Sequence, residues 1–480
     1  LVSAFPLEPS YCDHYAGILM RQDKAQLAIA AYERLLELAP KFIDSRYNFA
    51  RLLKQARKPE QALEQYQLGL EQGISNPAQV HTNMSVIHTE QGRDDAARES
   101  LQLALSENDE YIPALYNLAL LEEEHGSIDK ARELFEQILV LDSHHVNAMV
   151  RLAYCQRFTE AEPLLERRLK HALAQSSDTG LAKENINYAL GKLADDCGQY
   201  SQAFEYFQAA NKRGSARSAS YDPTAQGLLR EQLQASSKIV IEPVSEQPLL
   251  FICGMFRSGS TLLEQMLAAH PDLTAGGEIG FFREHAPLPA ALTSTSSEFH
   301  QLGTDYLSRL AQVGADTSRI TNKRPDSFLH LGIILKLFPN ARVLNTTRHP
   351  LDNALSIYTQ PFEAEVDYDN SLLEIGHYYY QYRLLMQHWG EQYPENIQDV
   401  AYEQLVLEPR AAMEEVLEFL DLPWSDQCLE YHQLENRVRT ASVWQVRQPL
   451  YRQSLDRREH YSNELKELAE YFANFRITRD

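Results

Sequence analysis

Small and bulky apolar residues recur at regular intervals along the first half of the chain. In the first four units the small residues stand 34 or 35 residues apart. Further small residues follow in the next two units, so the full set is Ala16, Ala50, Ser85, Ala119, Ala153 and Gly191. In most of these units an alanine follows twelve residues later and a bulky residue four residues beyond it, namely Ala28 and Tyr32, Ala62 and Tyr66, Ala97 and Leu101, Ala131 and Phe135, and Ala203 and Phe207. Small residues let two antiparallel helices approach closely, and the bulky residue fills the space between them. The spacing therefore predicts an array of helix pairs, each of which buries its apolar face on its neighbours.

The fifth unit breaks this spacing. Ala153 is in phase, but Ala161 and Leu165 arrive about four residues early. We therefore expect the second helix of this unit to be shortened or displaced. The alanines and aromatic residues of the array are expected to serve packing, so that any function of the array resides in its concave surface.

The pattern changes in the second half of the chain. After residue 215 the repeat stops, and a polar stretch that contains Pro243 and Pro248 leads into short apolar runs that alternate with longer helical segments. Strands are predicted at 249–253, 342–345 and 398–402, and helices at 326–338, 351–358, 371–389 and 411–420. This alternation indicates a parallel sheet covered by helices. We expect an all-α solenoid over residues 1–215, a connector over 216–247 and an α/β domain over 248–480.

Charge and cysteine content narrow the functional classes. The formal net charge of the 480 residues is −22, from 67 acidic and 45 basic residues, which disfavours binding to nucleic acid and to anionic membranes. No run of about 18 apolar residues is present to span a bilayer. The N-terminus shows no charged segment before an apolar run, although the chain starts at Leu1 without Met, which leaves a removed leader open. The five cysteines are scattered without a CxxC pair, so neither a disulfide framework nor a metal site is expected, and a cytoplasmic location is favoured.

A glycine-bounded turn follows the first predicted strand of the second half. Residues 249–253 lead directly into 254–261, Gly-Met-Phe-Arg-Ser-Gly-Ser-Thr, and an amphipathic segment comes next. A strand, turn and helix of this kind direct backbone N–H groups and a helix N-terminus at one anion. Ser258, Ser260 and Thr261 can add hydroxyl donors.

The turn lacks the lysine of a nucleoside triphosphatase. Its spacing matches a P-loop, but Ser260 stands where that lysine would be. Arg257 instead offers a planar guanidinium to a phosphate or sulfate oxygen. A nucleotide with a short 5′ chain is therefore favoured over ATP, and a P-loop kinase is the disfavoured alternative.

A second turn follows the predicted strand at 342–345. Arg348 lies at its end, and Ser356 lies two turns into the following helix. One supplies charge and the other a hydroxyl, so the two residues are expected to meet at a second phosphate group.

Together the two turns resemble the phosphosulfate-binding motifs of the sulfotransferase superfamily. The likeness is greatest to tyrosylprotein sulfotransferases and to bacterial repeat-containing sulfotransferases, and it covers roughly residues 248–461. The helical array in turn resembles tetratricopeptide repeats, most closely around Tyr188–Gly191. The resemblance implies a tetratricopeptide-type solenoid followed by a P-loop-like sulfotransferase domain. It also implies 3′-phosphoadenosine 5′-phosphosulfate (PAPS) as donor, 3′-phosphoadenosine 5′-phosphate (PAP) as product and no metal.

The resemblance assigns the donor-binding residues. The 5′-phosphosulfate would be held by the first turn, through Arg257, Ser258, Gly259, Ser260 and Thr261. The 3′-phosphate would be held by Arg348 and Ser356, while Tyr402 would pack near the nucleotide. In the C-terminal segment, Ser442 would reach the sulfonate region and Arg457 would be a cationic phosphate ligand. The family commonly has Trp directly after that cation, whereas this chain has Arg458.

The resemblance also implies the transfer chemistry. Glu278 would be the general base that takes the proton of the acceptor hydroxyl. Lys323, which stands in an apparently polar turn at 320–325, would stabilise the departing oxygen, and Ser442 would add a hydrogen bond there. A histidine base is the alternative, for which His270 and His349 are the candidates.

The acceptor and the partners are less closely defined. Protein or peptide tyrosine, another phenol or a small hydroxyl compound fits the family, and Phe281 with Phe282 is expected to border a phenol pocket. Only Arg283 follows Glu278 closely among basic residues, which weakens the case for an acidic peptide. The repeat array is expected to bind a protein or to self-associate. The alternative reading is a repeat scaffold with an inactive or kinase-like nucleotide-binding domain.

Overall fold

The computed structural model describes most of the chain, in two compact units. The described residues are 9–22, 24–160, 163–176, 181–217, 220–313, 320–362, 366–434, 436, 438, 446–448, 450 and 452–475. The first unit comprises Leu1–Glu123 with Ser127–Ala148, and the second comprises Glu124–Gly126 with Met149–Asp480. None of the helices in these described stretches is long and apolar enough to cross a bilayer.

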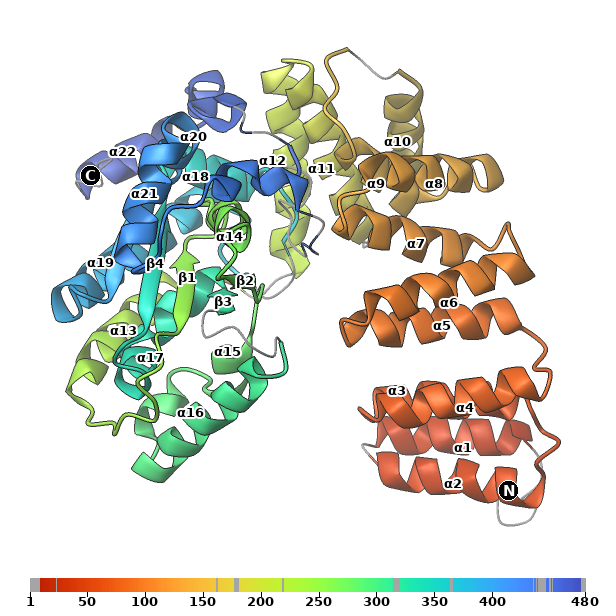
Figure 1. Cartoon of the computed structure of the whole chain (residues 1–480). Coiled ribbons are helices and arrows are strands. Elements are labelled where there is room, and N and C mark those ends of the chain that lie inside the picture. Colours follow the sequence, from red (N-terminus) through yellow and green to blue (C-terminus); the bar gives the residue numbers. More distant parts are fainter. Residues whose placement is uncertain are drawn as a thin grey trace. The chain divides into compact units, whose positions relative to one another are not determined.

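The first unit is an array of helix pairs (Figure 1). Its helices are α1 (Pro9–Arg21), α2 (Ala25–Leu38), α3 (Ser45–Gln55), α4 (Pro59–Glu71), α5 (Pro77–Glu90), α6 (Asp94–Glu107), α7 (Ile112–Glu124) and α8 (Ile128–Leu141). The alanines of the repeat are fully buried, as Ala28 and Ala62 illustrate, and the ring of Tyr32 stacks on Phe49 with centroids 5.5 Å apart. The predicted array of helix pairs is confirmed.

The repeat helices continue into the second unit. They are α9 (Val146–Tyr154), α10 (Pro163–Gln175), α11 (Leu181–Asp196) and α12 (Tyr200–Arg217). The prediction that the second helix of the fifth unit is shortened or displaced is wrong, because α10 has 13 residues and begins at Pro163, in phase with the start of α8 at Ile128, whereas α9 has only nine residues. Helix α9 ends early because Phe158 turns inward, where its side chain is buried and its N–H donates to Asp196 Oδ2 at 3.0 Å. Ala161 lies outside the described residues.

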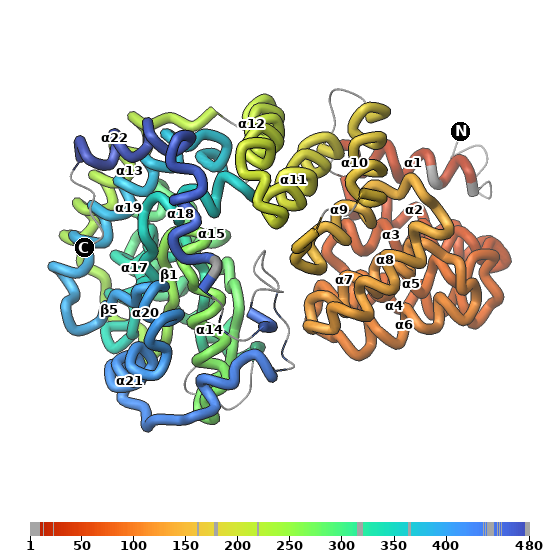
Figure 2. The backbone as a smooth tube through the Cα atoms, turned by 90° about the horizontal axis from the view of Figure 1, so that it is seen from above, coloured from red at the N-terminus to blue at the C-terminus, as the bar shows by residue number. Residues whose placement is uncertain are grey.

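The last helix pair shows why a small residue is needed at each crossing. A Cβ atom on Gly191 would lie 2.5 Å from the ring of Phe207, so no larger residue fits between α11 and α12. The same pair packs on the α/β part of the unit, and Figures 1 and 2 both show α12 beside it. Asn211 Nδ2 donates to the carbonyl of Tyr358 at 2.8 Å, and Phe204 stacks on Tyr358.

The α/β part contains a parallel sheet with strand order β2-β3-β1-β4-β5. Its strands are β1 (Leu250–Gly254), β2 (Thr274–Ala275), β3 (Ile320–Lys323), β4 (Arg342–Thr347) and β5 (Ile397–Ala401). All pairs are parallel, with Leu250 opposite Thr321 on one side and opposite Arg342 on the other. The predicted parallel sheet is therefore confirmed, whereas the polar turn expected at 320–325 is in fact the strand β3 followed by a 3₁₀ turn.

Helices cover both faces of the sheet. One face carries α14 (Ser260–Ala268), α20 (Tyr402–Leu407) and α21 (Pro409–Phe419), and the other carries α17 (Leu331–Leu337), α18 (Pro350–Tyr358) and α19 (Leu372–Gln392). Because side chains alternate along a strand, Leu250 and Ile252 join the first core while Phe251 and Cys253 join the second. The predicted helices of this half are confirmed, apart from 326–338, which begins as a 3₁₀ turn.

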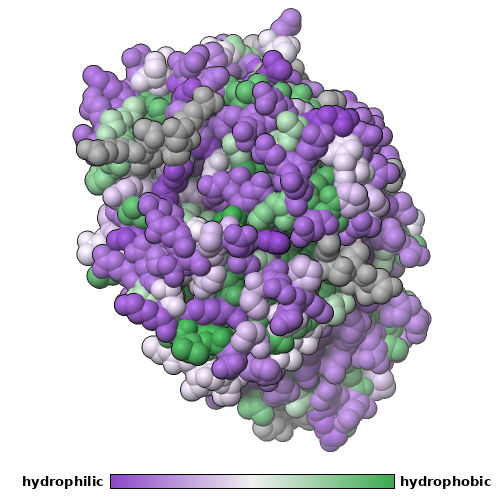
Figure 3. All heavy atoms as spheres, turned by 60° about the vertical axis from the view of Figure 1, so that its left-hand side comes forward, coloured by the Kyte–Doolittle hydropathy of each residue, from purple (hydrophilic) through white to green (hydrophobic). Residues whose placement is uncertain are grey.

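The remaining helices lie around this sandwich. They are α13 (Pro223–Ala235), α15 (Phe281–His285), α16 (Ser296–Leu310) and α22 (Lys466–Asn474). Helix α13 falls within the predicted connector 216–247, and its Leu233 is buried in the same core as Tyr188 and Phe207 of the last repeat. The predicted domain boundaries stay a prediction. On the face shown in Figure 3, hydrophilic residues predominate and hydrophobic ones form small separate patches.

Candidate active site

Two glycines shape the turn between β1 and α14. Gly254 has φ of +141°, and a Cβ there would lie 2.4 Å from the carbonyl oxygen of Thr346. Gly259 precedes α14 with φ of +101°, and a Cβ there would lie 2.6 Å from Cδ2 of Tyr402. Both positions therefore require glycine, for conformation and for space. The turn presents the N-terminus of α14 at the carboxyl ends of the strands, where parallel α/β sheets bind their ligands.

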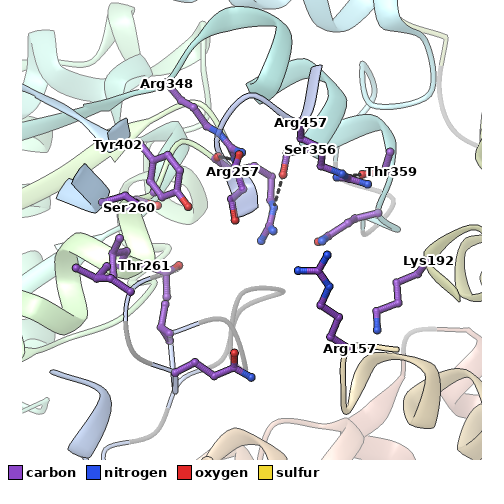
Figure 4. A pocket seen from close by; sticks show the side chains of 18 of the residues that line it. Arg157, Lys192, Arg257, Ser260, Thr261, Arg348, Ser356, Thr359, Tyr402 and Arg457 are labelled. Carbon is purple, nitrogen blue, oxygen red and sulfur yellow. Dashed lines mark hydrogen bonds between the residues drawn. The ribbon is translucent and has the colours of Figure 1, made fainter. Parts of the chain in front are cut away.

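Arg257 lies at the tip of this turn in a conformation that is unfavourable for its residue type. Its φ is +65°, in the left-handed region. Such strain persists only where the surrounding structure holds it, and it clusters at functional sites. Nε of Arg257 donates to Oγ of Ser356 at 3.2 Å, so the turn and α18 meet through this bond (Figure 4).

The three hydroxyl residues of the turn differ in position. Ser258 is buried, and its Oγ donates to the carbonyl of Met255 at 2.7 Å and lies 2.6 Å from Oγ1 of Thr346. It holds the turn together and does not line the cavity beside it. Ser260 and Thr261, in the first turn of α14, do line that cavity.

Arg348 connects the turn, Tyr402 and the C-terminal segment. Its Nη1 donates to the carbonyl of Arg257 at 3.1 Å and its Nη2 to the carbonyl of Ser454 at 2.7 Å. Its guanidinium carbon lies 4.7 Å from the ring centroid of Tyr402. Nε of Arg348 is buried and has no hydrogen-bond partner among the described residues. One donor of this guanidinium is thus left for a ligand.

The C-terminal segment contributes a further arginine. Nη2 of Arg457 lies 2.9 Å from Asp195 Oδ2, and Nη1 donates to Oγ1 of Thr359 at 3.2 Å. The neighbouring Arg458 pairs with Asp352 in α18 through its backbone N–H at 2.8 Å and through its guanidinium. An ion pair therefore anchors this segment to α18.

These residues line one cavity of about 390 Å³ within the second unit (Figure 4). Of the predicted donor-binding residues, the cavity brings together Arg257, Gly259, Ser260, Thr261, Arg348, Ser356, Tyr402 and Arg457. Among the described residues that line it are five cationic side chains and two carboxylates. In a chain of net charge −22, such a local excess of positive charge favours an anionic ligand at this place.

Glu278 and Lys323 form a close ion pair at the same edge of the sheet. Nζ of Lys323 lies 2.6 Å from Oε1 of Glu278; the lysine side chain is 1% exposed and the glutamate side chain 33% exposed. Lys323 pairs with Ile252 of the neighbouring strand β1. It therefore lies beside the end of β1, close to where the glycine turn begins. Neither residue lines the 390 Å³ cavity itself. Ser442, the third predicted catalytic residue, lies outside the described residues.

A buried glutamate that was not predicted supports this pair. Oε1 of Glu264, in α14, accepts from the N–H of Gly277 at 3.0 Å and from Oγ1 of Thr321 at 2.8 Å. Burial raises the pKa of Glu264, although the charge of Lys323 opposes the shift. Glu264 thereby fixes the backbone directly before Glu278. In sequence it resembles an ordinary polar position of an amphipathic helix, and nothing local distinguishes it.

The two histidine candidates have other contacts. Nε2 of His270 donates to the carbonyl of Pro423 at 2.9 Å, and its Nδ1 accepts from the N–H of Asp272 at 3.2 Å. Both ring nitrogens are therefore engaged with the backbone in a buried site. His349 lies at the start of α18, with Nδ1 4.0 Å from Asp352 Oδ2.

Phe281 and Phe282, which were expected to border a phenol pocket, are core residues and do not line the 390 Å³ cavity. Both side chains are buried, and both pack against Tyr306 of α16, with centroids 5.5 and 4.8 Å away. They belong to the core because α16 covers them, which the sequence around Glu278 does not indicate.

Several residues of the last repeats also line the cavity, and the sequence had assigned this region to packing. They are Tyr154, Arg157, Lys192, Asp195, Asp196 and Phe207. The available signal was the group of charged residues Lys192, Asp195 and Asp196 after the mostly apolar stretch 186–191 of the same helix. A charged cluster on a helix is usually a solvated face, so this signal is weak without the structure.

Comparison with known families agrees with this architecture. Residues 248–426 match the sulfotransferase family, and residues 9–42 and 47–112 match tetratricopeptide repeats. The chain therefore combines tetratricopeptide repeats with a sulfotransferase-family domain, as the helical spacing and the two turns predicted.

Individual relatives are similar over part of their length. An uncharacterized protein from Aquifex aeolicus is 31% identical over 314 residues, which are 60% of this chain and 41% of the relative. A protein-tyrosine sulfotransferase from Drosophila melanogaster is 30% identical over 217 residues, which are 40% of this chain and 42% of the relative. The chain thus spans about two fifths of the length of each. Among solved structures, the sulfotransferase domain of the Synechococcus PCC 7002 olefin synthase is 20% identical, with a TM-score of 0.35 over 49% of this chain and 98% of that domain.

Proposed function

We propose that this protein is a sulfotransferase that moves the sulfonate group of PAPS to an acceptor hydroxyl. The observation that carries the proposal is that the two turns, with Arg257 and Arg348, and Arg457 from the C-terminal segment line one cavity. A nucleotide with phosphate groups at both its 5′ and 3′ positions requires two such anion sites.

The first turn would hold the 5′ end of the donor. The N-terminus of α14, with the hydroxyl groups of Ser260 and Thr261, faces the cavity, and Arg257 supplies charge. Gly259 allows the backbone to approach closely, and Ser258 keeps the turn in shape. Since Ser260 replaces the lysine of nucleoside triphosphatases, ATP is the poorer fit.

The second site would hold the 3′-phosphate. The unpaired Nε of Arg348, the hydroxyl of Ser356 and the guanidinium of Arg457 come from three different segments. Tyr402, whose ring lies against Arg348, would pack beside the nucleotide. The residues present therefore fit PAPS.

The pair of Glu278 and Lys323 would carry out the transfer. When bound, PAPS supplies a sulfonate group activated by its anhydride bond to phosphate. Glu278 accepts the proton of the acceptor hydroxyl as the oxygen of that hydroxyl bonds to sulfur. Lys323 stabilises the negative charge that develops on the oxygen whose bond to sulfur breaks, and Ser442 is assigned a hydrogen bond to the same oxygen.

Tyrosine of a protein or peptide, or another phenol, is the acceptor class we propose. The support is the similarity to protein-tyrosine sulfotransferases, which covers about two fifths of this chain. The repeat array would bind the acceptor protein or a second copy of the chain. A screen of peptides, phenols and saccharides with labelled PAPS tests this assignment, and label found only on saccharides would refute it. The cytoplasmic location stays a prediction.

Substitution of Arg348 tests the 3′-phosphate site. Arg348→Ala is expected to weaken PAP binding about tenfold or more, because a charge-assisted hydrogen bond is lost. Adenosine 5′-phosphosulfate, which has no 3′-phosphate, should be barely affected, because Arg348 reaches the first turn only through the carbonyl of Arg257. The matched control is Arg342→Ala, at the opposite end of the same strand. Calorimetry that showed equal weakening of both ligands would count against the assignment.

A further inference from the structure

The loop after α9 directs an arginine into the cavity. Arg157 lines the same cavity as Arg257, Ser356 and Arg457, and Figure 4 shows its guanidinium group directed toward the middle. Its side chain is exposed, and it has no carboxylate within 4.0 Å among the described residues. A cation that faces three other cationic or polar groups across a cavity, without a counter-ion, favours an anion between them.

A largely buried ion pair on α11 holds both neighbours of Arg157. Nζ of Lys192 lies 2.6 Å from Asp196 Oδ2, and these side chains are 14% and 12% exposed. Lys192 donates to the carbonyl of Gln156, while Asp196 accepts from the N–H of Phe158 at 3.0 Å. Burying an ion pair costs desolvation energy and adds little to stability by itself. Here the ion pair holds the backbone of Gln156 and Phe158, on each side of Arg157. The Cα atom of Arg157 is thereby held in place at the edge of the cavity.

Helix α11 also positions a cation from the C-terminal segment. Asp195, next to Asp196, pairs with Arg457 at 2.9 Å and accepts a hydrogen bond from the hydroxyl of Tyr461. One short stretch of a repeat helix therefore orients two arginines that line the cavity.

Arg157 lies at one end of the cavity. Figure 4 shows Ser260, Thr261 and Tyr402 on one side and Lys192 and Thr359 on the other. Arg157 approaches from the second side, where Arg457 donates to Thr359. Arg457, which is assigned above to the 3′-phosphate, lies on this side, whereas Arg348 lies beside Tyr402 and would reach the same phosphate from the first side.

We infer that the last two repeats form a wall of the donor site and that Arg157 is a ligand of the 3′-phosphate. The inference rests on the proposed function, because it takes the cavity as the PAPS site. It makes the repeat array part of the active site as well as a surface for partners.

Calorimetry of the full chain with PAP and with AMP tests this inference. Arg157→Ala is expected to weaken PAP binding roughly tenfold, about 1.4 kcal/mol, and to leave AMP binding unchanged. Arg157→Lys, which keeps the charge without the planar fork, should restore part of the loss. The matched control is Arg167→Ala, which removes an exposed arginine of α10 that does not line the cavity and should change neither ligand.

The outcomes separate this inference from the proposed function. Loss of PAP affinity in Arg157→Ala but not in Arg167→Ala supports it. If Arg157→Ala binds PAP as the wild type does while Arg348→Ala does not, the inference is wrong and the proposed function stands. Equal weakening of PAP and AMP would also contradict the 3′ assignment. If wild type itself binds PAP no better than AMP, the proposed function fails first.

Discussion

At the scale of single residues, the site depends on a few positions whose conformation or burial is unusual. Gly254 and Gly259 have positive φ and no room for a side chain, and Arg257 adopts a positive φ without being glycine. The glycines and the serines of this turn were predictable, because their types and spacing are contiguous in sequence. The conformation of Arg257 and its bond to Ser356 were not, since they depend on a residue 99 positions away.

Gly259→Ala tests the need for close approach at the turn. The substitution places a Cβ 2.6 Å from the ring of Tyr402 at φ of +101°, so we expect a lower melting temperature and weaker PAP binding. The control is Gly227→Ala in α13, where no atom lies within 4 Å. There we expect unchanged PAP binding and a stability gain of about 0.5–1 kcal/mol, since alanine favours a helix. If Gly259→Ala had the Kd for PAP and the melting temperature of the wild type, the Tyr402 ring would have moved to make room for the added Cβ, and the predicted need for glycine would be wrong.

Glu278→Gln tests the general base. The amide cannot accept the acceptor proton, so we expect turnover to fall by about 100-fold or more. Donor affinity should stay within about twofold of wild type, because Glu278 does not line the donor cavity. Glu284→Gln, a nearby exposed carboxylate in α15, is the control for charge removal. Near-normal turnover of Glu278→Gln would remove Glu278 as the base.

At the scale of elements, the sequence predicted those whose signal is local. Strands β1, β4 and β5 stood out as apolar runs, and the helices of the array stood out through their spacing. Strand β3 was missed because only Ile320 among its four residues is apolar. Its polar side chains are satisfied by distant partners, with Thr321 bonded to Glu264 and Lys323 to Glu278. Such partners come from the tertiary structure and cannot be inferred from the strand itself.

The segment that leads into α19 contains a carboxyl group with a strongly raised pKa. Burial raises the pKa of Asp369 to about 7. An aspartate in the unfolded chain titrates near pH 4, so the folded protein binds more protons between about pH 4 and 7. The stability contributed by protonated Asp369 is thus present at low pH and lost as pH rises through about 7.

Asp369→Asn removes this titration. We expect the variant to have a smaller fall in melting temperature between pH 5 and pH 8 than the wild type, and a higher melting temperature at pH 8. Asp109→Asn, an exposed position in the first unit, should behave as the wild type. If the melting temperature of Asp369→Asn depended on pH as that of the wild type does, Asp369 would be ionised in the folded protein without any loss of stability, and the account would be wrong.

At the scale of the whole molecule, charge is distributed unevenly. The chain carries a net charge of −22, yet five cations line the cavity in the second unit. Composition alone disfavoured polyanions and could not show this local excess. The motifs located the residues of the two turns that line this cavity, whereas the part supplied by the last repeats required the fold, because α11 and the C-terminal segment are distant in sequence.

The central claim is that one cavity recognises a nucleotide phosphorylated at both its 5′ and 3′ positions. Titration calorimetry of the full chain with PAP and with AMP at equal ionic strength tests it most directly. We predict that PAP binds about 100-fold more tightly, because Arg348 and Arg457 would each add a charge-assisted hydrogen bond to the additional phosphate. Equal affinity for the two nucleotides would contradict the claim.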